Sequence, residues 1–588
     1  MTDFSREFFH TLRWRPLQAL EALYWHVTRR RVRARNRLWH NWHMAPDAYR
    51  RWTRMVERNP EVARRLAAES ATWPTCPLIS VLVDASGSDS VGLASQIASV
   101  LAQPYPNLEV LVCGEGAALP DDPRLRRITA APGATALEAA LVAAGGSLLL
   151  PLAPGAVLPE TALLRWAEAL RGNPQAAVFY ADEDLVDGAG ARSRPWLKPE
   201  WHRELLLSQD YLSGCCAIRV DAARALLPLA GDRRAEPLYG LLLELTAEAA
   251  APVCHVPHIL CHRPEWRGQE RQAERLTVLS AHLEGSGAEV TAGPFGTHRV
   301  RWPLPDPAPL VSIIVPTRDK ADLLRACLAS VIEKTTWPAY EIIVVDNNSE
   351  EPETFACFAE FARHPAVRVL TDPRPYNFSA INNRAVAEAR GDYVCLLNND
   401  TEVIAPGWLD ELMRQAVRPH VGAVGAKLLY PDGSIQHAGV VIGMGNAAGH
   451  AHRTLGEGEI GYFAQAHVAR EATAVTAACL VVARDKFDAV GGLDEDGLAI
   501  AYNDVDLCLK LQAAGWTNIY VPTAVLYHHE SVSRGDDFAP EHNLRYMAEL
   551  KVLQERWDTR KVVDPLHHPR LDRAGDQYVL AFRMEELG

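Results

Sequence analysis

Residues 392–402 read DYVCLLNNDTE, and this stretch decides the fold that the sequence predicts. Its apolar run, residues 393–397, is short and bounded by polar residues, which is typical of a strand buried in a parallel sheet. The run ends in Asn398, Asn399 and Asp400. Open α/β sheets bind ligands just beyond the carboxyl ends of their strands, so this carboxylate is well placed for a site. Alone the stretch is weak evidence, because strands often end in Asn or Asp to form a turn.

Two further predicted strands end in polar residues in the same way. Residues 311–315 lead into Thr317 and Arg318, and residues 341–345 lead into Asp346. The apolar residues between these two strands recur at helical spacing, and a strand–helix–strand unit indicates a parallel sheet. We therefore expect all three carboxyl ends to line one crevice. There Asp346 can accept hydrogen bonds from a nucleotide, and Asp400 can hold a hard divalent cation.

The pattern occurs twice in the chain. Residues 77–83 (PLISVLV) resemble residues 309–315 (PLVSIIV), and residues 108–112 (LEVLV) resemble residues 340–344 (YEIIV) at the same offset. A repeat of this length indicates a duplicated domain. We expect an α/β protein with two doubly wound, mostly parallel sheets. The expected divisions are a basic helical segment (1–71), a first domain (72–268), a connector (269–304), a second domain (305–560) and a C-terminal tail (561–588).

The first copy lacks the polar strand ends of the second. Gly114 stands where the second copy has Asp346, and residues 153–155 (APG) replace residues 398–400 (NND). Alanine, proline and glycine supply neither a metal ligand nor a base, so we expect the first copy to be degenerate. Its acidic cluster, residues 182–184 (DED), is on its own more typical of a solvated loop.

Composition narrows the class of protein. The 588 residues are 48% hydrophobic and 23% charged, with a net charge of −13, which is ordinary for a soluble globular protein. Residues 1–70 differ, with 15 arginines, no lysine and seven acidic residues. The acidic balance of the remainder argues against a nucleic-acid partner. The basic segment is expected to be helical, either on an anionic membrane surface or as a solvated helix packed on the next domain.

The compartment is inferred from cysteines and hydropathy. The 11 cysteines are scattered without CxxC spacing, so neither a zinc site nor a disulfide framework is indicated. The first ten residues lack the continuous apolar core of a secretory signal. Residues 139–159 are uncharged, but their prolines and Gly145-Gly146 favour a strand and a turn over a spanning helix. We expect a soluble cytoplasmic protein, with peripheral contact at the inner membrane as a further expectation.

The motifs together resemble the inverting family 2 of nucleotide-sugar glycosyltransferases, which has the GT-A fold. The resemblance is closest to bacterial enzymes that build O-antigen and related surface polysaccharides, including rhamnosyltransferases, and it covers the second copy almost throughout. The first copy is similar to an accessory domain of such proteins through residues 180–184 (YADED) and 198–201 (KPEW). The segments that carry the main resemblance are residues 311–319, 341–349, 376–404, 476–496, 502–516 and 527–535.

This resemblance implies roles for individual residues. Asp504 matches the catalytic base, although a carboxylate beside Asn503 also suits the N-terminus of the helix that follows. Asp400 and His528 match ligands of Mg²⁺ or Mn²⁺, with His529 equally well placed. The implied nucleotide-sugar site consists of Thr317, Arg318, Asp346, Asn382 and Asn399. The implied acceptor region consists of Thr476, Cys479 and Asp506.

The implied reaction transfers a sugar from a dTDP- or UDP-sugar to a hydroxyl of a glycan or lipid-linked glycan. The QxxRW signature of processive synthases is missing, which favours a non-processive enzyme. Two alternatives stay open. A nucleotidyltransferase on a similar sheet would need a basic, glycine-rich loop after its first strand, of which residues 316–319 (PTRD) are a poor version. The second alternative is a catalytically dead scaffold in a polysaccharide assembly complex.

Overall fold

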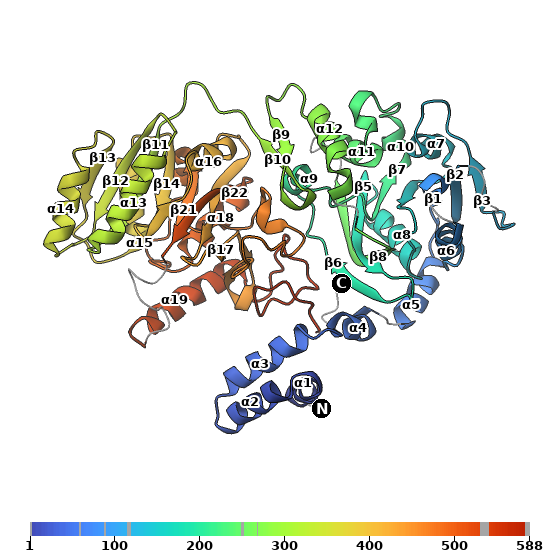
Figure 1. Ribbon diagram of the computed structural model, residues 1–588, viewed down its shortest axis with the longest axis horizontal. Coiled ribbons are helices and arrows are strands. Elements are labelled where there is room, and N and C mark those ends of the chain that lie inside the picture. Colours follow the sequence, from blue (N-terminus) through green and yellow to red (C-terminus); the bar gives the residue numbers. More distant parts are fainter. Residues whose placement is uncertain are drawn as a thin grey trace.

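The computed structural model describes residues 3–57, 60–87, 90–114, 119–247, 252–266, 269–529 and 540–582. Two α/β units lie side by side, each built on one sheet, with N-terminal helices below them (Figure 1). We call residues 79–301 the first unit and residues 311–557 the second unit. The expected α/β class is confirmed. Residues 267–268, 530–535 and 583–588, where the first domain, the last resemblance segment and the tail were expected to end, lie outside the described residues.

The second sheet contains the strands that end in Asn, Asp and Thr. Its order is β13-β12-β11-β14-β21-β16-β22-β15, with β17 on β16 and β20 on β22. The first four strands in this order are parallel, whereas β21 runs antiparallel to both of its neighbours. The strands are β11 (Val311–Thr317), β12 (Tyr340–Asp346), β13 (Val367–Thr371), β14 (Tyr393–Leu397), β15 (Thr401–Val403), β16 (Val421–Leu429), β17 (Ile435–His437), β20 (Arg470–Glu471), β21 (Cys479–Ala483) and β22 (Thr517–His528).

Helices cover both faces of this sheet. Ile313 packs with side chains of α13 and α16, whereas its neighbour Ile314 packs with side chains of α15 and α18. A strand buried on both faces needs apolar residues at every position, which explains the continuous apolar runs. The helices of the second unit are α13 (Ala321–Lys334), α14 (Pro352–Phe361), α15 (Phe378–Glu388), α16 (Trp408–Ala416), α17 (Arg484–Ala489), α18 (Asn503–Ala513) and α19 (Pro540–Trp557).

The first sheet repeats this topology. Its order is β3-β2-β1-β4-β7-β5-β6, and β8 pairs in parallel with β5 as β22 does with β16. The strands are β1 (Ile79–Asp84), β2 (Leu108–Cys113), β3 (Leu125–Ile128), β4 (Leu148–Leu152), β5 (Val178–Val186), β6 (Arg192–Trp196), β7 (Cys216–Arg219) and β8 (Val253–Arg263). The helices are α6 (Ser90–Leu101), α7 (Ala136–Ala143), α8 (Ala162–Gly172), α9 (Arg203–Ser208), α10 (Val220–Arg224), α11 (Pro237–Leu245) and α12 (Gln272–His282).

A hydrogen-bonded link at the amino ends of the central strands supports the second sheet. Ser312 Oγ donates to Glu341 Oε1 at 2.7 Å and accepts the Gly391 N–H at 2.9 Å. A Cβ on Gly391 would lie only 2.7 Å from the carbonyl oxygen of Leu310, so the approach of the two chains requires glycine.

The first sheet contains the same link. Ser80 Oγ donates to Glu109 Oε1 at 2.6 Å and accepts the Gly146 N–H at 3.0 Å. A Cβ on Gly146 would lie 2.6 Å from the carbonyl oxygen of Leu78. Gly146 therefore occupies the place of Gly391, which supports the alignment on which the comparison of strand ends depends.

Part of the expected connector is folded. Residues within 269–304 form α12 and a hairpin of β9 (Glu289–Ala292) and β10 (His298–Arg301). Val278 and Leu279 of α12 are buried in a core of the first unit. The two units contact each other directly, with Arg418 Nη2 2.6 Å from Glu204 Oε1 and Phe463 stacked on Trp196 at 4.5 Å. The exact domain boundaries stay predictions.

The N-terminal segment is helical, as expected. Helices α1 (Asp3–Trp14), α2 (Pro16–Val27) and α3 (Arg31–His43) pack on one another and project away from both sheets, whereas α4 (Ala48–Trp52) and α5 (Pro60–Ser70) lead back to the first unit (Figure 1). Within the described ranges, no helix has both the length and the apolar composition needed to cross a bilayer. Residues 139–159 contain the end of α7 and the strand β4.

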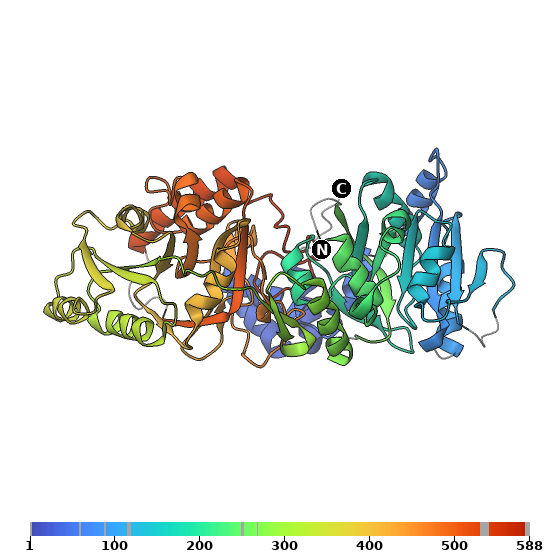
Figure 2. The same ribbon diagram turned by 90° about the horizontal axis from the view of Figure 1, so that it is seen from above.

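The C-terminal segment, residues 558–582, joins all three parts. Asp564 is buried and accepts hydrogen bonds from Thr473 Oγ1 at 2.6 Å and the Ile442 N–H at 2.7 Å, both in the second unit. The ring of Phe582 contacts Trp42 of α3 at 5.4 Å. Seen from above, this segment lies between the two units (Figure 2).

Candidate active site

The carboxyl ends of β11, β12 and β14 meet at one edge of the second sheet, as expected. Thr317, the last residue of β11, lies opposite Asp346 in the strand register. Thr317 Oγ1 also accepts a hydrogen bond from Asn399 Nδ2 at 2.9 Å, which ties the end of β14 to the end of β11. Thr317, Asp346 and Asn399 are thus gathered in one place, although they are far apart in the sequence.

The loops after β11 and β12 hold Asp346 in a fixed position. Asp346 Oδ1 accepts the Ser349 N–H at 3.0 Å, which closes a local turn. Asp319 Oδ1 accepts the N–H groups of Glu350 and Glu351 at 2.8 and 2.9 Å. These bonds stabilise the two loops against each other, so a nucleotide would meet a preformed edge.

Asp400 lies beside His528 because of a strand pairing. β15 begins immediately after Asp400 and runs antiparallel to β22, with Thr401 opposite His528. His528 Nε2 is 3.2 Å from Asp400 Oδ1, and both side chains are largely buried. The ring of His529 instead lies 3.6 Å from Glu402 Oε2. The structure therefore brings His528, and not the ring of His529, to Asp400.

Two side-chain amides set the tautomer of His528. Its Nδ1 lies 2.6 Å from Gln436 Oε1, an acceptor, so Nδ1 carries the proton. Its Nε2 lies 3.3 Å from Asn398 Nδ2, a donor, so Nε2 is the acceptor. The Nε2 lone pair and a carboxylate oxygen of Asp400 thus face the same space.

This pair suits a hard divalent cation. Adjacent ligands of an octahedral Mg²⁺ or Mn²⁺ ion, at about 2.1 Å from the metal, are about 3 Å apart, close to the observed separation. Gln436, which sequence reasoning missed, acts as the group that orients the ligand histidine. Gln436 is a buried polar residue in the short strand β17, and only strand pairing brings it to His528.

Asp504 lies in the first turn of α18, so the helix dipole favours its charge. Its Oδ2 accepts the Ala477 N–H at 3.0 Å, and the neighbouring Ala478 carbonyl accepts the Asn398 N–H at 3.1 Å. Asp504 is thereby linked through residues 477–478 to the end of β14, and it is partly exposed. Thr476 directly precedes this link. The position is compatible with a base and with a helix-terminal role.

Several expected site residues point elsewhere. Asn382 and Cys479 have no exposed surface, and burial raises the pKa of the Cys479 thiol well above its usual range. Asp506 is also fully buried, and its carboxylate binds Arg556 at 2.8 Å and Trp557 at 2.9 Å. Asp506 therefore holds α19 against α18. Arg318 is at the edge but exposed, with its guanidinium 3.6 Å from Glu350.

The acidic cluster of the first unit is not the solvated loop that the sequence suggested. Residues 182–184 lie in β5 and have no exposed surface. Glu183 contacts Lys198 Nζ at 3.1 Å and Arg263 Nη1 at 3.2 Å, and Asp184 contacts Arg192 Nε at 2.5 Å. The strand can bury these carboxylates because cations from other segments neutralise them.

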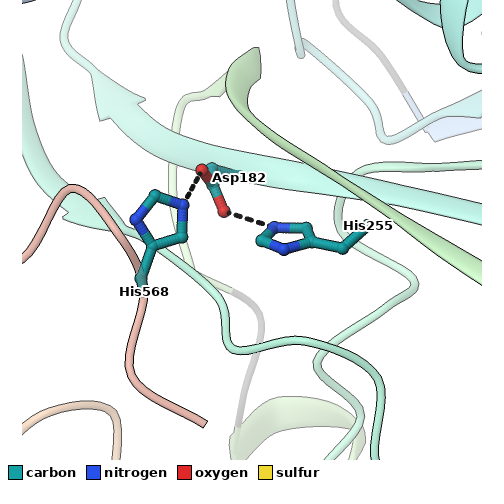
Figure 3. Close-up of side chains that lie close together, drawn as sticks. All are labelled: Asp182, His255 and His568. Atoms are coloured by element: carbon teal, nitrogen blue, oxygen red, sulfur yellow. Dashed lines mark hydrogen bonds and ion pairs between the residues drawn. The ribbon is translucent and has the colours of Figure 1, made fainter. Parts of the chain in front are cut away.

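Asp182 forms a compact cluster with His255 of β8 and His568 of the C-terminal segment (Figure 3). His255 Nε2 is 3.1 Å from Asp182 Oδ1, and His568 Nε2 is 2.9 Å from Asp182 Oδ2. The ligand atoms lie within 4.8 Å of one another, close enough for one metal ion.

The surrounding hydrogen bonds favour protons over a metal in this cluster. The Arg570 N–H points at His568 Nδ1 at 3.0 Å, so neutral His568 carries its proton on Nε2 and directs it at Asp182. Burial lowers the pKa of His255, but Asp182 and Glu200 outweigh it and raise that pKa above its ordinary value. A cation would have to displace a proton from each ring. The cluster therefore acts as a hydrogen-bonded link between β5, β8 and the C-terminal segment.

Residues 312–479 match the family model of Glycosyl transferase family 2. The chain carries a family 2 glycosyltransferase domain. The expected family 2 membership is thereby confirmed for this region. The matched stretch begins in β11 and ends at the start of β21, so the family 2 match includes Thr317, Asp346 and Asp400 but stops before Asp504 and His528.

Curated relatives extend the likeness beyond this domain. The chain is 38% identical over 536 residues to "Uncharacterized protein y4gI" of Sinorhizobium fredii, covering 86% of this chain and 59% of that protein. It is 36% identical over 543 residues to "O-antigen biosynthesis protein RfbC" of Myxococcus xanthus, covering 87% of this chain and 42% of that protein. The chain thus spans about half the length of these two relatives.

A third relative matches over a shorter region. The chain is 29% identical over 262 residues to "N-acetylglucosaminyl-diphospho-decaprenol L-rhamnosyltransferase" of Mycobacterium tuberculosis, covering 40% of this chain and 83% of that protein. A region of this length is about the size of one of the two units.

Proposed function

We propose that the second unit is a non-processive, inverting glycosyltransferase that moves a sugar from a nucleotide-sugar donor to a hydroxyl of a glycan in bacterial surface-polysaccharide biosynthesis. The observation that carries the proposal is the convergence of Asp346, the Asp400–His528 pair and Asp504 at the carboxyl edge of one sheet. The likeness to an O-antigen biosynthesis protein and to an L-rhamnosyltransferase supports this class of product.

The donor nucleotide would bind at the ends of β11 and β12. The buried Asp346 carboxylate would accept hydrogen bonds from the base or ribose, and Thr317 and Asn399 would line the same edge. Arg318, which is exposed, could turn toward the diphosphate. A dTDP- or UDP-linked sugar is the proposed donor.

Asp400 and His528 would hold Mg²⁺ or Mn²⁺. A bound divalent cation supplies positive charge that stabilises the departing diphosphate. Asp400 is the single carboxylate of residues 398–400, so the protein contributes only one negative charge there. We therefore expect the diphosphate oxygens of the donor to complete the ligand set, and cation affinity to depend on the nucleotide.

The transfer is a single displacement. The acceptor hydroxyl oxygen forms a bond to the anomeric carbon while the bond to the diphosphate oxygen breaks, which inverts the configuration. Asp504 accepts the hydroxyl proton as a general base, a role worth about 10²–10⁴-fold in rate. Thr476, beside the loop that holds Asp504, is a proposed acceptor contact.

The proposed acceptor is a lipid-linked glycan, which would bring the enzyme to a membrane surface. The name of the mycobacterial relative specifies a decaprenol-linked substrate for that protein, and this supports the same acceptor class here. Peripheral contact with the cytoplasmic face of the membrane is part of this proposal.

Incubation with nucleotide sugars and a polyprenyl-diphosphate glycan tests the function. Release of nucleoside diphosphate, dependent on acceptor and on Mg²⁺ or Mn²⁺, is expected, and a thermal-shift screen of nucleotide sugars identifies the donor. Release of pyrophosphate from a nucleoside triphosphate and a sugar phosphate would instead identify a nucleotidyltransferase. Absence of both reactions and of any nucleotide binding would identify a scaffold.

A further inference from the structure

Large apolar side chains of helix α2 are exposed, whereas a helix that is stabilised only by packing would bury them. Its buried residues are the small side chains Ala19 and Ala22, both fully covered. Its large apolar side chains face outward instead: Leu17, Leu20, Tyr24 and Val27 are 81%, 53%, 61% and 72% exposed. We call these four residues the α2 stripe.

The α2 stripe is one continuous face. Positions 17, 20, 24 and 27 follow the i, i+3, i+7, i+10 spacing, which places them on one side of a helix. The adjoining helices also carry exposed apolar side chains, Phe9 of α1 at 52% and Val32 of α3 at 62%. Single exposed apolar residues are ordinary, but a gathered set marks an interaction surface.

Arginines border the α2 stripe. Residues 29–31 (RRR) follow its last residue, and Arg33 and Arg35 lie on α3, which packs against α2. All five arginines are exposed. An apolar face beside several arginines matches the surface of an anionic bilayer, where acyl chains lie beneath negatively charged headgroups.

The position of α2 allows this contact. Helices α1 to α3 project away from both sheets (Figure 1), so a flat surface could reach α2 before it meets the rest of the molecule. The base of the projection is held by α4 and by Phe582, which packs on Trp42. Twelve residues of α2 rise about 18 Å, too short to cross a bilayer but sufficient to lie in its interface.

We propose that the α2 stripe and the arginines of residues 29–35 form a docking surface for anionic phospholipid, with α2 lying in the plane of the membrane interface. A second copy of the chain fits less well, because pairing two such faces would bring their arginines together. The surface is separate from the transferase site, so its binding can be measured without donor or acceptor. Failure of docking would therefore contradict the peripheral membrane contact proposed above and leave the proposed reaction untouched.

Vesicle flotation with the full chain tests the proposal. Vesicles of phosphatidylcholine with phosphatidylglycerol are expected to carry the protein, and vesicles of phosphatidylcholine alone to carry much less. Replacing the α2 stripe (Leu17→Ser, Leu20→Ser, Tyr24→Ser, Val27→Ser) should lower partitioning by about tenfold or more, because the apolar contact area is lost. Since these side chains are exposed, the melting temperature should stay unchanged.

Two further variants test whether the apolar contribution is specific to α2 and measure the electrostatic contribution to vesicle binding. Val91→Ser with Val142→Ser removes side chains that are 78% and 73% exposed in the first unit, and it should not alter partitioning. Arg29→Gln, Arg30→Gln and Arg31→Gln should weaken binding to anionic vesicles only and reduce its sensitivity to salt.

Three results would overturn the proposal. The parent protein could ignore anionic vesicles, or the variant without the α2 stripe could bind them as well as the parent does. Alternatively, light scattering could show that loss of the α2 stripe converts an oligomer to a monomer while vesicle binding persists, which would identify a second copy as the occupant.

Discussion

Each unit contains a buried aspartate beside a histidine, and the two pairs are built in opposite ways. In the second unit a side-chain amide accepts the Nδ1 proton of His528, so the Nε2 lone pair faces Asp400 at 3.2 Å. Asp182 of the first unit lies beside His568 of the C-terminal segment, where a backbone N–H points at Nδ1 of His568, so an Nε2 proton faces Asp182 at 2.9 Å. The hydrogen-bond partner of Nδ1 therefore decides what Nε2 offers to the aspartate. When Nδ1 donates, the Nε2 lone pair is available to a cation, and when Nδ1 accepts, the Nε2 proton is donated to the aspartate.

The same contrast extends over both sheets. The serine–glutamate–glycine link at the amino ends of the strands is present in both units, at nearly equal distances. At the carboxyl ends, Gly114 and residues 153–155 replace the polar side chains of the second unit. The first unit contains the interactions that stabilise the sheet and lacks the polar side chains that the second unit has at these strand ends. Its remaining carboxylates hold neighbouring segments together.

The largest effect is expected from Asp504→Asn in the second unit. Turnover should fall by about 10²-fold or more, at least ~2.7 kcal/mol, because the acceptor hydroxyl loses its base. Donor affinity, measured by calorimetry, should change little. Asparagine can still accept the Ala477 N–H and suits a helix N-terminus, so the melting temperature should also hold. Intact transfer would place the base elsewhere, and an unfolded variant would assign Asp504 to the helix.

The two Asp–His pairs can be tested directly by cation titration. Mn²⁺ should bind weakly to the free protein and more tightly with nucleoside diphosphate. His528→Gln should weaken the nucleotide-dependent binding by about tenfold or more, since a ligand atom is lost, and Gln436→Leu should weaken it less. His568→Gln, the matched change beside Asp182 of the first unit, should leave it unaltered. Equal Mn²⁺ affinity with and without nucleotide would contradict the shared ligand set.

A smaller effect is expected at the nucleotide edge. Asp346→Asn should weaken donor binding by about tenfold, ~1.4 kcal/mol, because a charged acceptor becomes neutral. Asp84→Asn provides the control, since Asp84 ends β1 in the first unit. Calorimetry with the donor should show no change for that variant. If both variants bound donor equally weakly, the first unit would have to contribute to donor binding.

The smallest effect on transfer is expected from Asp182→Asn. Turnover per folded molecule should stay within a few-fold, because the first unit takes no part in the reaction. Stability should fall by about 3–5 kcal/mol, since removing one partner of a buried ion pair leaves His255 with only the half-exposed Glu200 as its counter-charge. Thermal unfolding measures this. A folded variant without transferase activity would show that the first unit is also catalytic.

Local patterns predicted the strands and the edge of the site. The apolar runs that end at Thr317, Asp346 and Asp400 are visible in the sequence because each strand is continuous and buried. The carboxylates of residues 182–184 were misjudged because their partners lie elsewhere in the chain. Lys198 follows just after the next strand, β6, but His568 is in the C-terminal segment, and no local pattern reveals that contact.

The directions in which side chains point could not be predicted from the sequence either. Asp506 lies two residues after Asp504 on α18, so it points to the opposite side of the helix, toward Arg556. Gln436 reaches His528 only through the pairing of β17 with β16 and of β16 with β22. Strand order in a mixed sheet depends on pairings between distant segments, so it cannot be predicted from any one segment of the sequence.

The tie between Asp182 and His568 has a consequence for biosynthesis. A ribosome makes Asp182 long before it reaches the partner residue, about 20–80 s earlier at a rate of 5–20 residues per second. During that interval Asp182 in β5 lacks the imidazole of His568, which donates a hydrogen bond to it from the far end of the chain. The nascent first unit therefore lacks this contact until synthesis reaches residue 568, and a chain that stopped before that residue would never form it.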